Sequence, residues 1–489
     1  MVWDVREVER LDPGIPGLEL IARGGIPKGR LTLVAGTAGS GKTIFAAQFL
    51  AAGINAGEPG VFVTFEERPE SIRRNLRSFG WDIAAWEADA KWAFVDGAAR
   101  FTEDTTMLGD FDLSPLIARV HHAVQRTGAT RVAIDSVGAL VAQFETATPT
   151  RRAMFQLAAA VEEMGVTTVM TGERDEDYGP VAQFGFEEFV ADNVIVLRNA
   201  LEGEKRRRTL EVLKIRGGSH LKGEHLFTLL SERGIVVVPP QTAGFDYPAS
   251  TARMPWGNPK LDEMCGGGLF ERSLAMVTGP TGTGKSLLSS VFIMGGAEAG
   301  EKALLHSFEE SHDQICRNAD AWGFDFTRLE AEGRLKIIAQ APETSSLEDH
   351  LLMVQHAIDE FQPDRVAIDS LTALQRVSTV KSFREYVLGL TFHIKTKCRL
   401  GLVVTAAGVE AEPSVGGLHL ATVSDTIVVL NYVAVGGEIK RGIFVLKMRG
   451  SDHDEHVREF DIRGDGIHVL GAFDDVRGMV QGMWIGERR

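Results

Sequence analysis

The most constraining feature of this sequence is that it occurs twice within one chain. The run LTLVAGTAGSGKT at residues 31–43 returns as LAMVTGPTGTGKS at residues 274–286, an offset of 243 residues. Further along, VAIDSVGAL returns as VAIDSLTAL and LKIRGGSH returns as LKMRGSDH, at offsets of 234 and 233 residues. A period this long is the length of a domain, not of the short unit that a solenoid stacks. We therefore expect two related domains in tandem.

The expected boundary is the stretch that begins Pro239-Pro240, where an apolar run gives way to polar residues and Gly. It divides the chain into residues 1–240 and 241–489. Each half alternates helical patterns with short runs rich in Val, Ile and Leu. In the first half these runs are Thr32–Ala35, Val61–Phe65, Val132–Ile134, Thr167–Met170 and Val194–Leu197. Because they lack polar alternation, they are typical of a largely parallel sheet flanked by helices, so the fold class is α/β.

Each repeat contains a complete G-x-x-x-x-G-K-[ST] motif between an apolar run and a helical pattern, which is the context of a P-loop. In such a loop, backbone N–H groups surround phosphate oxygens, the lysine reaches the β- and γ-phosphates, and the hydroxyl binds Mg²⁺. The expected nucleotide-binding residues are Gly36, Thr37, Ala38, Gly39, Ser40, Gly41, Lys42 and Thr43, and in the second repeat Gly279, Pro280, Thr281, Gly282, Thr283, Gly284, Lys285 and Ser286. A chance Gly-rich loop would not occur twice in this context.

A pair of glutamates follows a predicted strand at the same place in both repeats. Glu66-Glu67 ends the run VFVTF, and Glu309-Glu310 ends the run LLHSF. A carboxylate beside a γ-phosphate can act as the base that orients water or a hydroxyl group. An acidic pair can also simply open a solvated loop, but the equal spacing from both P-loop lysines favours catalysis.

An aspartate ends a second apolar run in each repeat. Asp135 and Asp369 occupy the position at which an aspartate holds the Mg²⁺ shell in P-loop proteins, although an ordinary strand also often ends in Asp. Together with Thr43 and Ser286, they are the expected metal ligands.

The element LK-[IM]-RG carries two basic residues in alternate positions of a predicted strand. These are Lys214 and Arg216 in the first repeat and Lys447 and Arg449 in the second. Alternate residues project from one face of a strand. They are either solvated charges or, in a phosphate-binding protein, a second contact to nucleotide from a neighbouring subunit.

Charge and cysteine content narrow the function classes. The chain has 52 Lys and Arg against 67 Asp and Glu, a net charge of −15, which disfavours nonspecific binding to nucleic acid or anionic membranes. Its three cysteines are far apart, which argues against a disulfide framework or a structural zinc site. The N-terminus is charged, and no apolar run approaches the roughly 20 residues of a membrane span. The expected location is therefore the cytoplasm.

The tandem P-loops, the FEE pairs, the IDS strands and the stretches EEFVADNVIVLRNALEGEKRRRTLEVLKIRGGSHLKGEH and FVLKMRG resemble the KaiC family. That family comprises tandem RecA-like ATPases, known as circadian-clock proteins in cyanobacteria. The resemblance covers about residues 10–465. It implies two RecA-like P-loop domains, a homohexamer with ATP and Mg²⁺ at the subunit interfaces, an N-terminal ATPase, and a C-terminal Ser/Thr autokinase and autophosphatase. A KaiB-like partner is suggested by the resemblance alone.

Two departures from the family pattern qualify this expectation. The family phosphorylates an adjacent Ser-Thr pair, and the matching stretch HLATVSD has Thr422 at the threonine position but Ala421 at the serine position. Thr422 is therefore the expected phosphorylation site, and a two-site ordered cycle is not implied. The tail from about Gly464 does not resemble the segment that recruits KaiA, so KaiA is not expected as a partner.

Two other function classes remain open at this point. One is a RecA- or DnaB-like motor on DNA, which the fold permits. The acidic charge and the lack of interleaved basic and aromatic stretches count against it. The other is a nucleotide-gated scaffold whose ATP sites control partner docking without kinase activity.

Overall fold

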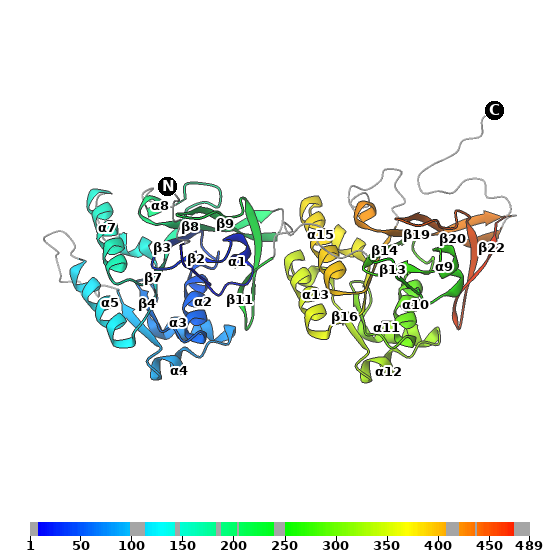
Figure 1. The fold of residues 1–489 in the computed structure, drawn as a ribbon, viewed down its shortest axis with the longest axis horizontal. Helices are drawn as coiled ribbons and strands as arrows, with labels where there is room; N and C mark the ends of the chain where they lie inside the picture. Colours follow the sequence, from blue (N-terminus) through cyan, green and yellow to red (C-terminus); the bar gives the residue numbers. More distant parts are fainter. Residues whose placement is uncertain are drawn as a thin grey trace, which may run out of the picture. The chain divides into compact units, whose positions relative to one another are not determined.

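The computed structural model describes residues 8–97, 113–141, 147–181, 187–202, 205–238, 250–406, 420–435 and 438–473. It divides into two compact units, Met1–Pro240 and Gln241–Arg489. In each unit, helices flank a central sheet (Figure 1). The strands of the two main sheets follow the same order, as expected from the sequence repeat.

Within its described residues, the first unit contains a nine-stranded sheet of order β5-β4-β6-β7-β3-β8-β9-β10-β11. The strands are β3 (Leu31–Gly36), β4 (Gly60–Thr64), β5 (Trp92–Asp96), β6 (Arg131–Asp135), β7 (Thr167–Glu173), β8 (Asn193–Glu202), β9 (Lys205–Ile215), β10 (Glu224–Leu230) and β11 (Gly234–Val237). Neighbours from β5 to β8 pair in parallel, and the pairs from β8 to β11 are antiparallel. The expected α/β class with a largely parallel sheet is confirmed, and each predicted apolar run contributes to a strand.

Helices cover both faces of this sheet because successive residues of its buried strands point in opposite directions. The helices are α1 (Leu18–Ile21), α2 (Lys42–Asn55), α3 (Pro69–Leu76), α4 (Ile83–Ala88), α5 (Ser114–Thr127), α6 (Val137–Val141), α7 (Ala147–Glu163) and α8 (Glu187–Val190). Val34 of β3 packs in one core cluster with Phe45 and Phe49 of α2. Its neighbour Leu33 packs in a second cluster with Leu157 of α7. A short pair, β1 (Arg10–Leu11) and β2 (Ile26–Pro27), lies outside the main sheet.

The second unit repeats this architecture, with the strand order β16-β15-β17-β18-β14-β19-β20-β21-β22 in its described residues. The strands are β14 (Ser273–Gly279), β15 (Ala303–Ser307), β16 (Leu335–Ala339), β17 (Arg365–Asp369), β18 (Leu400–Ala406), β19 (Thr426–Val435), β20 (Glu438–Met448), β21 (Arg458–Arg463) and β22 (Gly466–Ala472), with the short pair β12 (Arg253–Met254) and β13 (Leu269–Phe270). The helices are α9 (Pro259–Met264), α10 (Lys285–Glu298), α11 (His312–Ala321), α12 (Phe326–Ala331), α13 (Leu347–Phe361), α14 (Leu371–Arg376) and α15 (Val380–Lys397).

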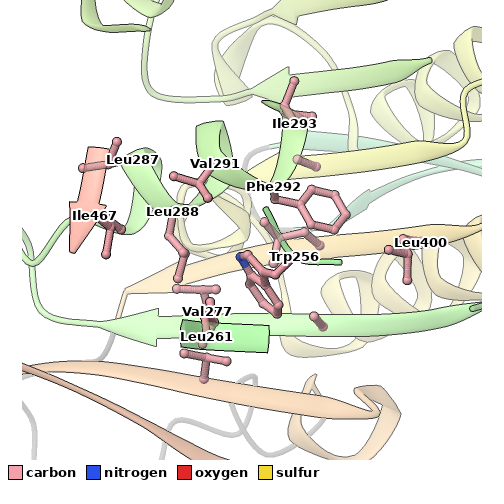
Figure 2. Close-up of a cluster of buried hydrophobic side chains, with 14 of the residues drawn as sticks. Trp256, Leu261, Val277, Leu287, Leu288, Val291, Phe292, Ile293, Leu400 and Ile467 are labelled. Carbon is pink, nitrogen blue, oxygen red and sulfur yellow. The ribbon is translucent and has the colours of Figure 1, made fainter. Parts of the chain in front are cut away.

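The core of the second unit fixes α10 against the sheet. Figure 2 shows Leu288 and Phe292 of α10, Val277 of β14 and Trp256 within one buried cluster. The Trp256 and Phe292 rings meet edge to face, with centroids 6.0 Å apart. Burying a Phe side chain stabilises a fold by roughly 1.5–3 kcal/mol. This packing therefore holds the strand, the helix and the loop between them in one place.

Candidate nucleotide-binding sites

Each P-loop leaves the carboxyl end of a central strand, β3 in the first unit and β14 in the second, and enters the following helix. Gly36 and Gly279 end these strands. A Cβ atom on Gly36 would lie 2.7 Å from the carbonyl oxygen of Leu197, and one on Gly279 would lie 2.2 Å from that of Leu430. Only glycine allows the backbone to approach so closely. The motif glycines thus shape a loop at the carboxyl end of the central strand of each sheet, which is the end where α/β proteins bind ligands.

The helices that follow begin without a side-chain cap among the described residues. Their N-cap residues are Gly41 and Gly284, with φ angles of 99° and 103°. The first N–H groups of a helix have no intrahelical acceptor, and together with the helix dipole they attract anions. The geometry of both loops fits a polyphosphate, as predicted for the P-loop residues.

The P-loop lysines lie inside their loops. Lys42 Nζ donates hydrogen bonds to the carbonyl oxygens of Gly36 and Thr37, at 2.9 and 3.1 Å. Lys285 Nζ donates to the carbonyl oxygen of Pro280 at 2.8 Å. Burial lowers the pKa of both ammonium groups, and nearby carboxylates partly offset that shift. Each loop therefore holds its lysine ammonium group at the place where the phosphates of a nucleotide would bind.

The predicted metal ligands come together in both units. The Thr43 hydroxyl is hydrogen-bonded to the Asp135 carboxylate, and the Ser286 hydroxyl to that of Asp369. Asp135 also accepts a bond of 2.5 Å from Thr171 Oγ1. Burial raises the pKa of Asp135, and it raises the pKa of Asp369 to about 6. Oxygen donors of this kind are what Mg²⁺ prefers, so the donor set fits the expected ion.

The two glutamates of the first unit have different surroundings. Glu66 accepts a hydrogen bond from Ser136 Oγ, and its charge acts on the Lys42 ammonium. Glu67 instead accepts a bond of 3.0 Å from Asn75 Nδ2, on α3. The first glutamate therefore faces the P-loop, whereas the second is turned to the following helix.

The second unit repeats these contacts, although the charge of Glu310 also acts on the Asp369 carboxylate. Glu309 acts on the Lys285 ammonium, and Glu310 accepts bonds of 3.4 Å from Asn318 Nδ2, on α11. Asn75 and Asn318 are 243 residues apart, so the amide belongs to the repeat. Neither asparagine belongs to a motif recognised in the sequence, although the common offset of 243 residues marks both of them.

The basic residues of LK-[IM]-RG lie at the opposite edge of the sheet from the P-loop of their own unit. Lys214 pairs with Val194 at the start of β8 and donates to the carbonyl oxygens of Glu188 and Ala191, at 3.1 and 2.8 Å. Arg216 lies 3.3 Å from the Asp192 carboxylate. Lys214 and Arg216 therefore both contact the segment that joins α8 to β8.

A β-bulge precedes each of these lysines. Pairing between β8 and β9 skips Leu213, and pairing between β19 and β20 skips Leu446. Leu213 is 39% exposed and Leu446 is 52% exposed, whereas Ile215 is buried. A bulge redirects side chains in this way. Each unit consequently presents an apolar side chain beside its basic pair.

The family model described as "ATPase: KaiC" matches residues 11–242 and again residues 254–473. The chain belongs to the KaiC family of ATPases. It is 48% identical over 476 residues to the circadian clock protein KaiC3 of Synechocystis sp., which is 97% of this chain and 94% of that relative. It is 46% identical over 470 residues to the circadian clock oscillator protein KaiC of Synechococcus elongatus, covering 96% and 90% of the two chains. The protein of Thermosynechococcus vestitus with the same description is 46% identical over 478 residues, covering 97% and 92%. The resemblance read from the motifs is thereby confirmed.

In this KaiC-family chain, Thr422 is exposed in a helical turn at residues 420–423, just before β19. Arg449 Nη2 donates to its carbonyl oxygen at 2.5 Å. Lys447 Nζ donates to the carbonyl oxygens of Ala421 and Ser424, each at 2.8 Å. The basic pair of the second unit thus fixes the backbone of this turn.

The two KaiC-type units differ at the end of the strand beside the P-loop strand. Gly36 pairs with Glu173 at the end of β7, and this carboxylate raises the pKa of Lys42 against the effect of burial. Gly279 pairs with Ala406 at the corresponding place. Glu173 was not among the predicted site residues, although its position just after a predicted apolar strand is a signal that could have identified it. Among the described residues, no helix is both long and apolar enough to cross a membrane.

Proposed function

We propose that this KaiC-family ATPase works as an ATP-dependent homohexamer in the cytoplasm, and that its second unit transfers the γ-phosphate of ATP to Thr422. The relatives named as circadian clock proteins support a timing or signalling role. A KaiB-like partner is part of the proposal on the family resemblance alone. The tail on which the KaiA expectation rests lies largely beyond residue 473, outside the described residues.

The observation that carries the proposal is the separation of two groups of residues within one unit. The P-loop follows Gly279 at the carboxyl end of β14, whereas Thr426, at the start of β19, pairs with Ala275 near the amino end. At about 3.3 Å per residue, these strand positions are roughly 13 Å apart. Thr422 lies before β19, and Asp425 accepts a bond from the backbone of Leu274. Thr422 is thus at the edge away from the P-loop of its own unit.

A ring resolves this separation. In a closed head-to-tail ring, one surface of each subunit meets a different surface of the next. In the second unit, the edge that carries Thr422, Lys447 and Arg449 then faces the P-loop of the neighbouring subunit. In the first unit, the edge that carries Lys214 and Arg216 faces the neighbour's P-loop in the same way. Both nucleotide sites are completed by basic residues that cannot reach the nucleotide of their own unit.

The chemistry follows from the residues in place. Ser286 and Asp369 would hold Mg²⁺, which when bound neutralises charge on the phosphate oxygens. Lys285 and the loop N–H groups position the phosphates, and Glu309 orients the Thr422 hydroxyl and takes its proton. The bond from the γ-phosphorus to ADP breaks as the bond to Thr422 Oγ1 forms. In the first unit, Glu66 orients a water molecule in the same role.

Mass spectrometry of the full chain after incubation with Mg-ATP tests the proposal. Phosphate on Thr422, with hydrolysis that added DNA does not stimulate, is the expected result. DNA-stimulated hydrolysis would instead support a motor, and hydrolysis without phosphate on the protein would support a scaffold.

A further inference from the structure

Three side chains that commonly bind metals converge outside the nucleotide sites, on helices α11 and α12. His312 and Cys316 lie one turn apart on α11, so they share a face of that helix. Glu330 reaches them from α12. One ligand atom from each of the three residues lies within 4.8 Å of the other two.

The contacts show how closely the group is assembled. His312 Nε2 lies 2.7 Å from Glu330 Oε2, and His312 Nδ1 lies 4.0 Å from Cys316 Sγ. The His312 side chain is 49% exposed, whereas that of Glu330 is 26% exposed. Cys316 is largely buried. The cluster is therefore open to solvent on the histidine side and closed on the thiol side.

The corresponding helices of the first unit, α3 and α4, are joined by an ion pair. At the positions 243 residues earlier, Arg73 and Glu87 form a two-bond ion pair, with Nε–Oε2 and Nη2–Oε1 distances of 2.6 and 2.8 Å. Glu330 repeats Glu87, but Cys316 stands where Arg73 would be. The second unit keeps the carboxylate between the two helices and replaces its permanent cation with a thiol.

We propose that His312, Cys316 and Glu330 bind a divalent transition metal of the Zn²⁺ class, which joins α11 to α12. Thiolate, imidazole and carboxylate are the ligands of this class of ion, and three of them leave one tetrahedral position for water or a fourth ligand. The exposed Asp313 is a further carboxylate beside the group, with its Oδ1 3.5 Å from His312 Nδ1. The metal supplies the positive charge that Arg73 supplies in the first unit.

Binding replaces protons on two of the ligands. Burial raises the pKa of the Cys316 thiol, and the hydrogen bond to Glu330 raises the pKa of His312. Both groups thus hold their protons more tightly than usual, and the metal must displace them. Affinity consequently rises with pH, and binding releases protons.

Titration of the reduced full chain with Co²⁺, in the presence of Mg²⁺, tests the site directly. Cobalt bound to a thiolate gives a sulfur-to-cobalt charge-transfer band in the near ultraviolet, which oxygen ligands of the nucleotide sites cannot produce. The expected result is one such band per chain, which Zn²⁺ removes by displacement. His312→Gln and Glu330→Gln should weaken Co²⁺ binding by at least the roughly 10–100-fold that follows loss of an outer-shell partner.

The decisive variant is Cys316→Arg, because it restores the ion pair with Glu330 that the first unit already contains. It should fold, assemble and give no charge-transfer band. Cys398→Ala removes a buried thiol elsewhere and should leave the band unchanged. Absence of the band in the unmodified protein, or its persistence in the Cys316→Arg variant, would show that these residues form only an ion pair between two helices.

Discussion

Glu67 accepts a hydrogen bond of 3.0 Å from the side-chain amide of Asn75, and the same contact recurs between Glu310 and Asn318 at 3.4 Å. The following helix thus fixes the second glutamate of each pair. The first glutamate is left beside the P-loop lysine. We infer that the first glutamate of each pair is the base and that the second positions the loop.

The first prediction separates the two glutamates of the first unit. In a chain whose second site is inactivated by Glu309→Gln, Glu66→Gln should lower ATP hydrolysis by roughly 10²–10⁴-fold, the usual cost of losing a positioned base. Glu67→Gln keeps an acceptor for Asn75 and should cost much less. Steady-state phosphate release measures both. Equal losses of activity would mean that Glu66 and Glu67 share the role of the base. Hydrolysis at the wild-type rate by a Glu66→Gln/Glu67→Gln variant would show that neither glutamate is the base.

The second prediction concerns assembly. Because Lys214 and Lys447 lie at the edge away from their own P-loops, ATP should bind between two subunits. A ligand that binds only the assembled state stabilises that state, so ATP should favour the ring. Sedimentation velocity with ATP, with ADP and without nucleotide should show a hexamer that is most populated with ATP. The Lys214→Ala/Lys447→Ala variant should shift the population toward monomer. A monomer of the unmodified chain under all three conditions contradicts an interfacial site.

The third prediction is a pH dependence of the second Mg²⁺ site. Burial raises the pKa of Asp369 from 3.8 to about 6. The carboxylate is therefore protonated in the folded chain below pH 6, and Mg²⁺ must displace that proton. Mg²⁺ affinity should fall as the pH drops through about 6. The stability of the ligand-free chain should change with pH in the opposite direction. The raised pKa of Asp369 stabilises the fold at low pH, and this contribution is lost as the pH rises from 3.8 to about 6.

Thermal unfolding with and without Mg-ATP, across this pH range, measures both trends. The stabilisation by Mg-ATP should grow as the pH rises through about 6. The Asp369→Asn variant has no proton to exchange at this position, so its ligand-free stability should lack the decline. A pH profile that is the same in both proteins would assign the effect to another group.

Local patterns predicted the parallel part of the sheet, the loops after β3 and β14, and the places of Asp135 and Asp369 at the ends of strands, because a motif and the strand before it are contiguous in sequence. The rest depends on residues that meet only in the folded chain. Asn75 reaches back to Glu67 from the second turn of α3, and the bulge that exposes Leu213 arises from pairing between two strands. The approach of Glu330 to His312 depends on how two helices pack. Alternation alone also could not show that Thr422 lies in a helical turn rather than at a strand start.

The fourth prediction is that Thr422 is the phosphate acceptor. It is exposed, whereas nearby Ser424 is buried, with its Oγ donating to the Leu420 carbonyl oxygen at 2.8 Å. Phosphopeptide mapping after incubation with Mg-ATP should find phosphate on Thr422. Thr422→Ala should remove this phosphate while hydrolysis by the first unit continues, and Glu309→Gln should lower the rate of its appearance. Ser414 lies outside the described residues, and phosphate found only there or on Ser424 would exclude Thr422.

Mixed rings test the direction of transfer. One subunit carries Lys285→Ala, which disables its own second site but keeps Thr422, and the other carries Thr422→Ala with an intact site. Neither protein alone should become phosphorylated at this position, because one lacks the donor site and the other the acceptor. Since Thr422 lies at the edge away from its own P-loop, the mixture should label the Lys285→Ala subunit, to a degree that rises with the share of active neighbours. If the mixture stays unlabelled while rings of unmodified chains are labelled, transfer occurs within one subunit and the second unit must rearrange to bring Thr422 to its own nucleotide.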